Sequence, residues 1–235
     1  MRSVLVAAVV LALAAPAHAE FCGFVGLDAQ VVSSPDRVIP GDGGILVAAM
    51  RGHGHSDKDV ADQPTWRFQS GGTSTEPRRS TLAPGLVVYH ARQDGTVSLV
   101  EHDGTVRASA FFTRRPRARL AAPVVSWVVR APDRVDVLLG LAKNPPVDAI
   151  AIVVVGKDGK ARSWDFLDPE STIQRVYKQR GCELAPPGTL PSNAGDEVTF
   201  FYVDADGRAS APSKRITIAA KTPSEARISP DDLDR

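Results

Sequence analysis

Four histidines follow residue 19, and two of them are close enough in sequence to bind one metal ion together. His53 and His55 are separated by one residue, and Asp57 follows within the same RGHGHSDKD stretch. In an extended segment alternate side chains lie on the same side, so both imidazoles would face one ion. Two or three imidazoles with a carboxylate suit Cu(II) or Zn(II). The candidate metal ligands are His53, His55, Asp57, His90 and His102.

The alternative is that this stretch is an exposed polar loop that binds no metal, and the sequence favours that interpretation. Asp57 and Asp59 offer oxygen ligands, but their spacing does not match a helix–loop–helix calcium site. We therefore expect no resident cofactor, with Cu or Zn as the alternative.

Signals for nucleophilic catalysis are absent from the sequence. The chain has no G-x-S-x-G segment, and neither cysteine stands in a C-x-x-C pair. Trp164 beside Asp165 and Asp168 could line a sugar site, but a buried strand aromatic explains it better. We expect a protein without enzymatic activity, the alternative being a hydrolase with an unrecognised site.

A cluster of arginines is the largest local charge excess: Arg114, Arg115, Arg117 and Arg119. It could contact anionic headgroups or an acidic partner, or it could be a solvated linker between domains. Nucleic acid is not expected as a partner. Without residues 1–19 the chain has 27 basic and 27 acidic residues, so it lacks the basic excess that nucleic-acid binding requires.

The first 19 residues have the pattern of a cleaved signal peptide. Arg2 precedes twelve apolar residues from Val4 to Ala15, and Ala17-His18-Ala19 supplies the small residues of a cleavage site before Glu20. Twelve residues are too short to span about 30 Å of hydrocarbon. We expect a periplasmic or secreted protein without a transmembrane span.

Short runs rich in Val, Ile and aromatic residues recur between Gly, Pro and Asp-Gly turns, which is the pattern of an all-β sandwich or barrel. In the second half the predicted strands are 124–129, 134–141, 148–155, 160–166, 172–178, 197–204 and 214–219. In the first half they are 30–38, 44–50, 65–69, 86–90, 96–101 and 105–113. The turns at Asp103-Gly104 and Asp206-Gly207 lie 103 residues apart, the length of one sandwich domain.

The segment AGDEVTFFYVDADGRASAPSKRITI, from Ala194 to Ile218, resembles the last two strands of a fibronectin type III or immunoglobulin-like domain. It departs from that family at Val198, where a tyrosine is usual. The resemblance implies two tandem immunoglobulin/fibronectin-like β-sandwich domains, and it implies nothing about activity. We expect a signal peptide at 1–19, sandwiches at 20–115 and 123–220, a linker at 116–122 and a polar tail at 221–235. The function expected is an exported binding or structural accessory role in the cell envelope, with an unknown protein or glycan as partner.

The two cysteines, Cys22 and Cys182, are expected to form a disulfide, because an isolated pair in an oxidising compartment is most simply a bridge. The alternative is two buried free thiols. The bridge would close a loop of about 160 residues and stabilise the fold by at most roughly 5 kcal/mol. Peptide mapping of exported protein without reductant should recover a linked Cys22–Cys182 fragment. Alkylation of both thiols before reduction would contradict the bridge.

Overall fold

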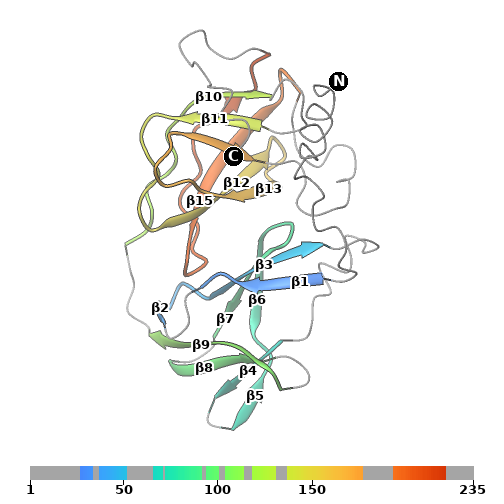
Figure 1. The fold of residues 1–235 in the computed structure, drawn as a ribbon, viewed down its shortest axis with the longest axis vertical. Helices are drawn as coiled ribbons and strands as arrows, with labels where there is room; N and C mark the ends of the chain where they lie inside the picture. The colour runs from blue at the N-terminus through green and yellow to red at the C-terminus, as the bar shows by residue number, and fades with distance from the viewer. Residues whose placement is uncertain are drawn as a thin grey trace, which may run out of the picture.

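The computed structural model describes residues 27–33, 37–51, 66–70, 72–91, 94–100, 104–113, 118–130, 137–176 and 193–220. Within these ranges the regular structure consists of sixteen β-strands, which form two sandwiches (Figure 1). The expected all-β fold of two tandem sandwiches is confirmed. In this part of the chain there is no helix that could cross a bilayer.

The first sandwich has two sheets, with strand orders β1-β3-β7-β6 and β2-β9-β8-β4-β5. Its strands are β1 (Leu27–Val31), β2 (Arg37–Pro40), β3 (Ile45–Arg51), β4 (Arg67–Ser70), β5 (Thr73–Thr75), β6 (Arg78–Ala83), β7 (Leu86–His90), β8 (Gly95–Val100) and β9 (Val106–Thr113). Taken in chain order these sheets match strands A, B, E, D and C, F, G of an immunoglobulin domain. Two strands are added to these seven: β2 pairs in parallel with β9, and β5 pairs antiparallel with β4.

The second sandwich has sheets of order β10-β11-β14 and β13-β12-β15-β16. Its strands are β10 (Val125–Arg130), β11 (Val137–Leu141), β12 (Ala149–Gly156), β13 (Ala161–Phe166), β14 (Ile173–Val176), β15 (Glu197–Asp204) and β16 (Ile216–Thr217). These correspond to A, B, E and C, F, G, with β13 added beside C. Residues 167–172 lead directly from β13 to β14, so this sandwich lacks the strand D that the first one has.

Each sandwich encloses its own apolar core. In the first, Trp66 stacks on Tyr89 with ring centroids 5.7 Å apart, and Phe68 packs against Phe112. In the second, Phe200 and Tyr202 of β15 pack among aliphatic side chains of both sheets. These inward positions alternate along the strands, as burial of one face of a pleated strand requires.

The Asp-Gly turns have the backbone that the sequence predicts. Gly95, Gly104, Gly159 and Gly207 all have positive φ, which glycine adopts without a steric penalty. The predicted strand 30–38 is divided into β1 and β2, and the predicted strand 214–219 shortens to β16. The chain before β16 still provides hydrogen-bond acceptors for the backbone of β15. The hydroxyls of Ser210 and Ser213 accept hydrogen bonds from the N–H groups of Tyr202 and Phe200.

Tyr202 gives the second core a measurable pH dependence. Its side chain is buried, and burial raises the pKa of the phenol from 10.0 to about 12. The unfolded chain ionises at the lower pKa, so unfolding releases a proton between pH 10 and 12 and the free energy of unfolding falls as pH rises through that window. In Tyr202→Phe this fall should be shallower when urea unfolding is followed from pH 9 to 12. Equal slopes for variant and wild type would contradict the role of Tyr202.

Candidate functional site

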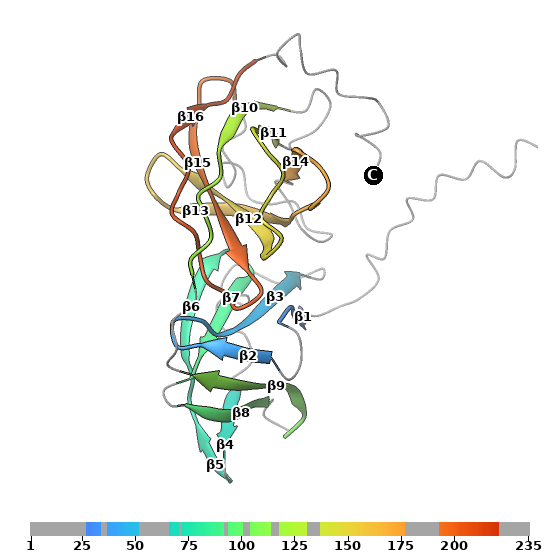
Figure 2. The same ribbon diagram turned by 90° about the vertical axis from the view of Figure 1, so that its left-hand side faces the viewer.

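The two sandwiches meet through the outer faces of their inner sheets. Leu46, Leu86 and Val88 project from β3 and β7 on the side away from their own core. They pack against a face of the second sandwich that includes Val153 and Trp164. The molecule is therefore a stack of four sheets along its long axis, shown from two sides in Figures 1 and 2.

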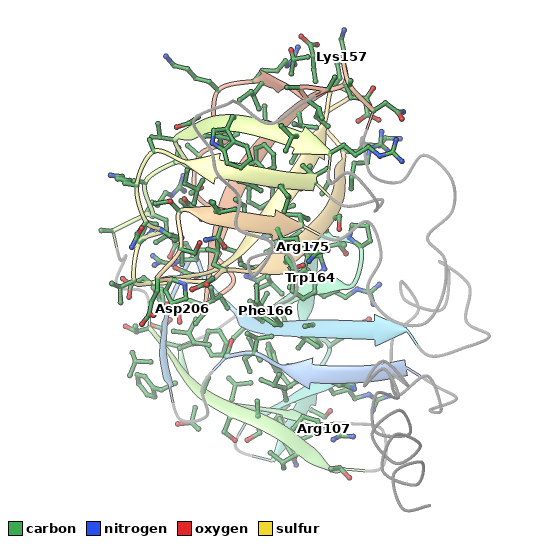
Figure 3. The ribbon with its side chains drawn as sticks, turned by 45° about the horizontal axis from the view of Figure 1, so that its top comes forward. Arg107, Lys157, Trp164, Phe166, Arg175 and Asp206 are labelled. Carbon is green, nitrogen blue, oxygen red and sulfur yellow. The ribbon has the colours of Figure 1, made fainter. Side chains whose placement is uncertain are left out.

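Trp164 joins the two sandwiches directly. Its side chain is 2% exposed, and its Nε1–H donates a hydrogen bond to the carbonyl oxygen of Pro84 at 2.9 Å. Phe166 meets the indole edge-on, with centroids 5.3 Å apart. Both rings lie at the boundary between the sandwiches in Figure 3. Trp164 is thus a buried strand aromatic rather than an open platform for a sugar.

The turn between β15 and β16 is braced internally before it reaches the first sandwich. Asp204 is 1% exposed, and its Oδ1 accepts the backbone N–H groups of Asp206 and Arg208. Its Oδ2 accepts Nε–H and Nη2–H of Arg208 at 2.9 and 2.6 Å. Removal of one member of such a buried pair typically costs about 3–5 kcal/mol, so this turn is held rigidly.

The braced turn docks on the first sandwich through hydrogen bonds to its backbone. The carbonyl oxygen of Asp206 accepts the N–H of Gly44 at 2.7 Å, and that of Ala205 accepts the hydroxyl of Ser33 at 2.7 Å. Arg208 also places Nη1 3.8 Å from Oδ1 of Asp42. Figure 3 shows Asp206 at this boundary.

Glycines permit this close approach. A Cβ at Gly43 would lie 2.9 Å from the carbonyl oxygen of Asp206, and a Cβ at Gly207 would lie 2.6 Å from Cγ2 of Val88. The GDGG segment at 41–44 therefore does more than turn the chain, because it lets the second sandwich sit against the first.

Continuous apolar runs in the sequence mark strands that are buried on both faces, and turn and motif reasoning does not use this signal. Residues 45–48, 86–89 and 151–154 are buried without interruption. Strands that are covered on one face alternate apolar and polar residues, whereas strands covered on both faces form continuous apolar runs. The runs ILVA, LVVY and AIVV belong to the two inner sheets, but the run VLLGL of β11 is equally continuous and lies in an outer sheet, so such a run does not identify the junction by itself.

Of the predicted metal ligands, His90 is the one that lies within the described residues. It is half-buried at the end of β7, with Nδ1 2.9 Å from the carbonyl oxygen of Gly43 and Nε2 3.1 Å from Oγ of Ser80. The carbonyl can only accept, so Nδ1 carries the proton. A metal on Nε2 would have to displace Ser80.

His53, His55, Asp57 and His102 lie outside the described residues, and so do Cys22, Cys182, Arg114, Arg115 and Arg117. Arg119 is exposed between the two sandwiches in sequence. Among the described residues no three His, Cys, Asp or Glu side chains come together as a metal site. The metal site, the disulfide and the arginine contact surface stay predictions.

The far face of the five-stranded sheet is exposed instead of packed. Val38 of β2 and Phe111 of β9 are register partners, and they are 59% and 47% exposed. Register partners on neighbouring strands point to the same side of a sheet. The outward side of this sheet, which runs from edge strand β2 through β9, β8 and β4 to edge strand β5, is called the outer β2–β5 face. It consists of Val38, Phe111, Arg67, Arg107 and a central row of polar side chains, Ser109, Ser98, Gln69 and Ser74. It lies at the opposite end of the molecule from Lys157 (Figure 3).

No protein-family model matches the chain, and no curated protein matches it. Among solved structures, the BSP domain of a biofilm-associated protein is 13% identical with a TM-score of 0.30, and the match covers 81% of this chain and 30% of that one. The fibronectin(III)-like modules of Clostridium thermocellum CbhA are 14% identical with a TM-score of 0.26, at coverages of 83% and 95%. A two-domain fibronectin type III segment of chicken tenascin is 13% identical with a TM-score of 0.27, at coverages of 82% and 98%.

This chain spans less than a third of the biofilm-associated structure. Because all three identities and TM-scores are low, the assignment to the immunoglobulin/fibronectin-like sandwich rests on the strand order of the two domains.

Two glycine variants separate the junction from backbone strain. Gly207 and Gly159 have φ of +70° and +79°, so alanine at either position costs about 1–2 kcal/mol for the left-handed conformation. At Gly207 the new Cβ would meet Val88, whereas at Gly159 it would have no atom within 4 Å apart from those of Gly159 and its chain neighbours. Urea unfolding should show Gly207→Ala to be less stable than Gly159→Ala by a further 1–3 kcal/mol, roughly the cost of overpacking. Equal losses would contradict the tight junction.

Proposed function

We propose that this protein is an exported, non-enzymatic binding module of the cell envelope, in which a rigid two-sandwich body presents the outer β2–β5 face to a partner. The observation that carries the proposal is the pair Val38–Phe111, two neighbouring apolar side chains that stay exposed at one end of the stack. Exposed apolar groups that gather on one face of a folded domain favour an interaction site.

The junction supports a presenting role, because it fixes one sandwich against the other. An apolar contact between two sheet faces, three backbone-directed hydrogen bonds and a braced turn all act at the same boundary. Interfaces of this kind restrict the relative motion that separate domains otherwise have. A partner would therefore meet one fixed orientation of the two sandwiches.

The turn between β15 and β16 takes no part in this display. In an immunoglobulin variable domain the loop between F and G binds ligands. Here the corresponding residues, Asp204 to Arg208, are engaged within the chain. The proposal accordingly uses a sheet face instead of loops.

Export to the periplasm or beyond is part of the proposal, and the signal-peptide pattern of residues 1–19 supports it. The full chain should be expressed with a C-terminal tag, fractionated and sequenced from its N-terminus. We expect envelope or secreted protein that begins at Glu20. Uncut protein confined to the cytoplasm would contradict the location.

The binding role is tested by photo-cross-linking in whole cells, which captures protein and glycan alike, followed by mass spectrometry of the tagged protein. We expect a recurring cross-linked envelope component that is lost in Phe111→Asp and retained in Val147→Asp. Val147 is the matched control, because it is 96% exposed in a loop of the second sandwich. Identical cross-linking of both variants and wild type would show that the outer β2–β5 face is not the binding surface.

A further inference from the structure

The outer β2–β5 face is ordered into rows by the strand register. Ser109, Ser98, Gln69 and Ser74 are consecutive register partners across β9, β8, β4 and β5. Neighbouring strands lie about 4.8 Å apart, so this row of hydroxyl and amide groups extends over roughly 14 Å. The Ser98 and Ser109 hydroxyls are hydrogen-bonded to each other at 2.8 Å, and each can still make further hydrogen bonds.

An aromatic side chain and arginines flank this polar row. Phe111 stands two residues from Ser109 on β9, and Arg67 stands two residues from Gln69 on β4. Arg107 is exposed at the start of β9. The row therefore has an apolar ring on one side and guanidinium groups on the other.

The charge of this sheet is one-sided although the chain as a whole is balanced. Of the strand residues on the outer side of this sheet, Arg67 and Arg107 are charged and none is acidic. The formal net charge of the entire chain is only +1. The face is therefore complementary to an anionic ligand.

We propose that the outer β2–β5 face binds an acidic polysaccharide, a carboxylate-bearing glycan chain. This inference rests on the proposed binding function and names its partner class. A serine-rich central row disfavours a protein partner, because serine is depleted in protein interfaces and rare among their energetic anchors. A row of hydroxyl and amide groups that crosses four strands suits an extended polymer, whereas small molecules select concave sites.

Each part of the face has a counterpart in such a glycan. The C–H groups on one side of a sugar ring pack on Phe111, whose ring face carries partial negative charge. The sugar hydroxyls exchange hydrogen bonds with Ser98, Ser109 and Gln69. A carboxylate meets Arg67, which can bind it through two N–H groups, and Arg107 adds positive charge on the same side of the row.

The test is calorimetric titration of the exported chain with oligogalacturonate, and with neutral dextran oligosaccharide of the same length. We expect saturable binding of oligogalacturonate that weakens as salt is added, because ions screen the arginine–carboxylate attraction. Dextran should not bind. Absence of saturable oligogalacturonate binding, or equal binding of dextran, would overturn the proposal.

Variants locate the binding surface. Arg67→Gln should weaken oligogalacturonate binding about tenfold or more, as expected for loss of a hydrogen bond to a charged group. Phe111→Ala should weaken it as well. Arg78→Gln is the control, because Arg78 is an exposed arginine on β6, in the other sheet of the same sandwich. Circular dichroism and thermal melts confirm folding of each variant, and wild-type affinity in folded Arg67→Gln would overturn the assignment.

The outcome also separates this inference from the function on which it rests. If oligogalacturonate does not bind but whole-cell cross-linking to a protein depends on Phe111, the glycan proposal fails and the binding function stands. If neither ligand nor cross-link depends on the face, both fail.

Discussion

Leu46, Leu86 and Val88 of the first sandwich and Ala151, Val153 and Trp164 of the second would all be exposed if either sandwich stood alone. This shared burial is the constraint on which the remaining structure depends. It requires β3, β7 and β12 of the inner sheets to be apolar on two faces, and glycine at 43 and 207, where a Cβ would press on the other sandwich. It also requires a carboxylate at Asp204 to hold the docking turn in shape. Sequence features that look unrelated therefore serve one contact.

The same constraint determines which surfaces can serve function. Two of the four sheets are covered on both sides, and the turn after β15 is bound to the first sandwich at the junction. The outer β2–β5 face remains exposed, with the aromatic ring of Phe111, a row of hydroxyl groups and two arginines. A rigid body with a chemically distinct terminal face is suited to holding that face at a set distance and angle from whatever carries the other end.

The sequence predicts the fold class, most strands and the turn glycines, because period-2 patterns and Asp-Gly pairs report on local backbone. It misses β5 and β6, whose sequences TST and RRSTLA are polar because they occupy sheet edges and face solvent. The junction was missed for a different reason. Trp164, Gly43 and Asp206 meet partners more than forty residues away, and no local pattern states which faces of two sandwiches will pack. The outer β2–β5 face is equally non-local, since its rows exist only once the register of four strands is known.

The stack of four sheets has a consequence for biosynthesis. The chain emerges from its N-terminus, so the strands of the first sandwich are complete at Thr113 while the docking turn at 204–208 is still unmade. For the length of some ninety further residues, the apolar face of β3 and β7 has no cover. Nascent protein in that interval offers an unpaired hydrophobic sheet face of the kind that chaperones bind and aggregates recruit. Folding of this protein is therefore sensitive to the rate at which its second half is synthesised. Truncation before Arg208 leaves an aggregation-prone product rather than a smaller stable one.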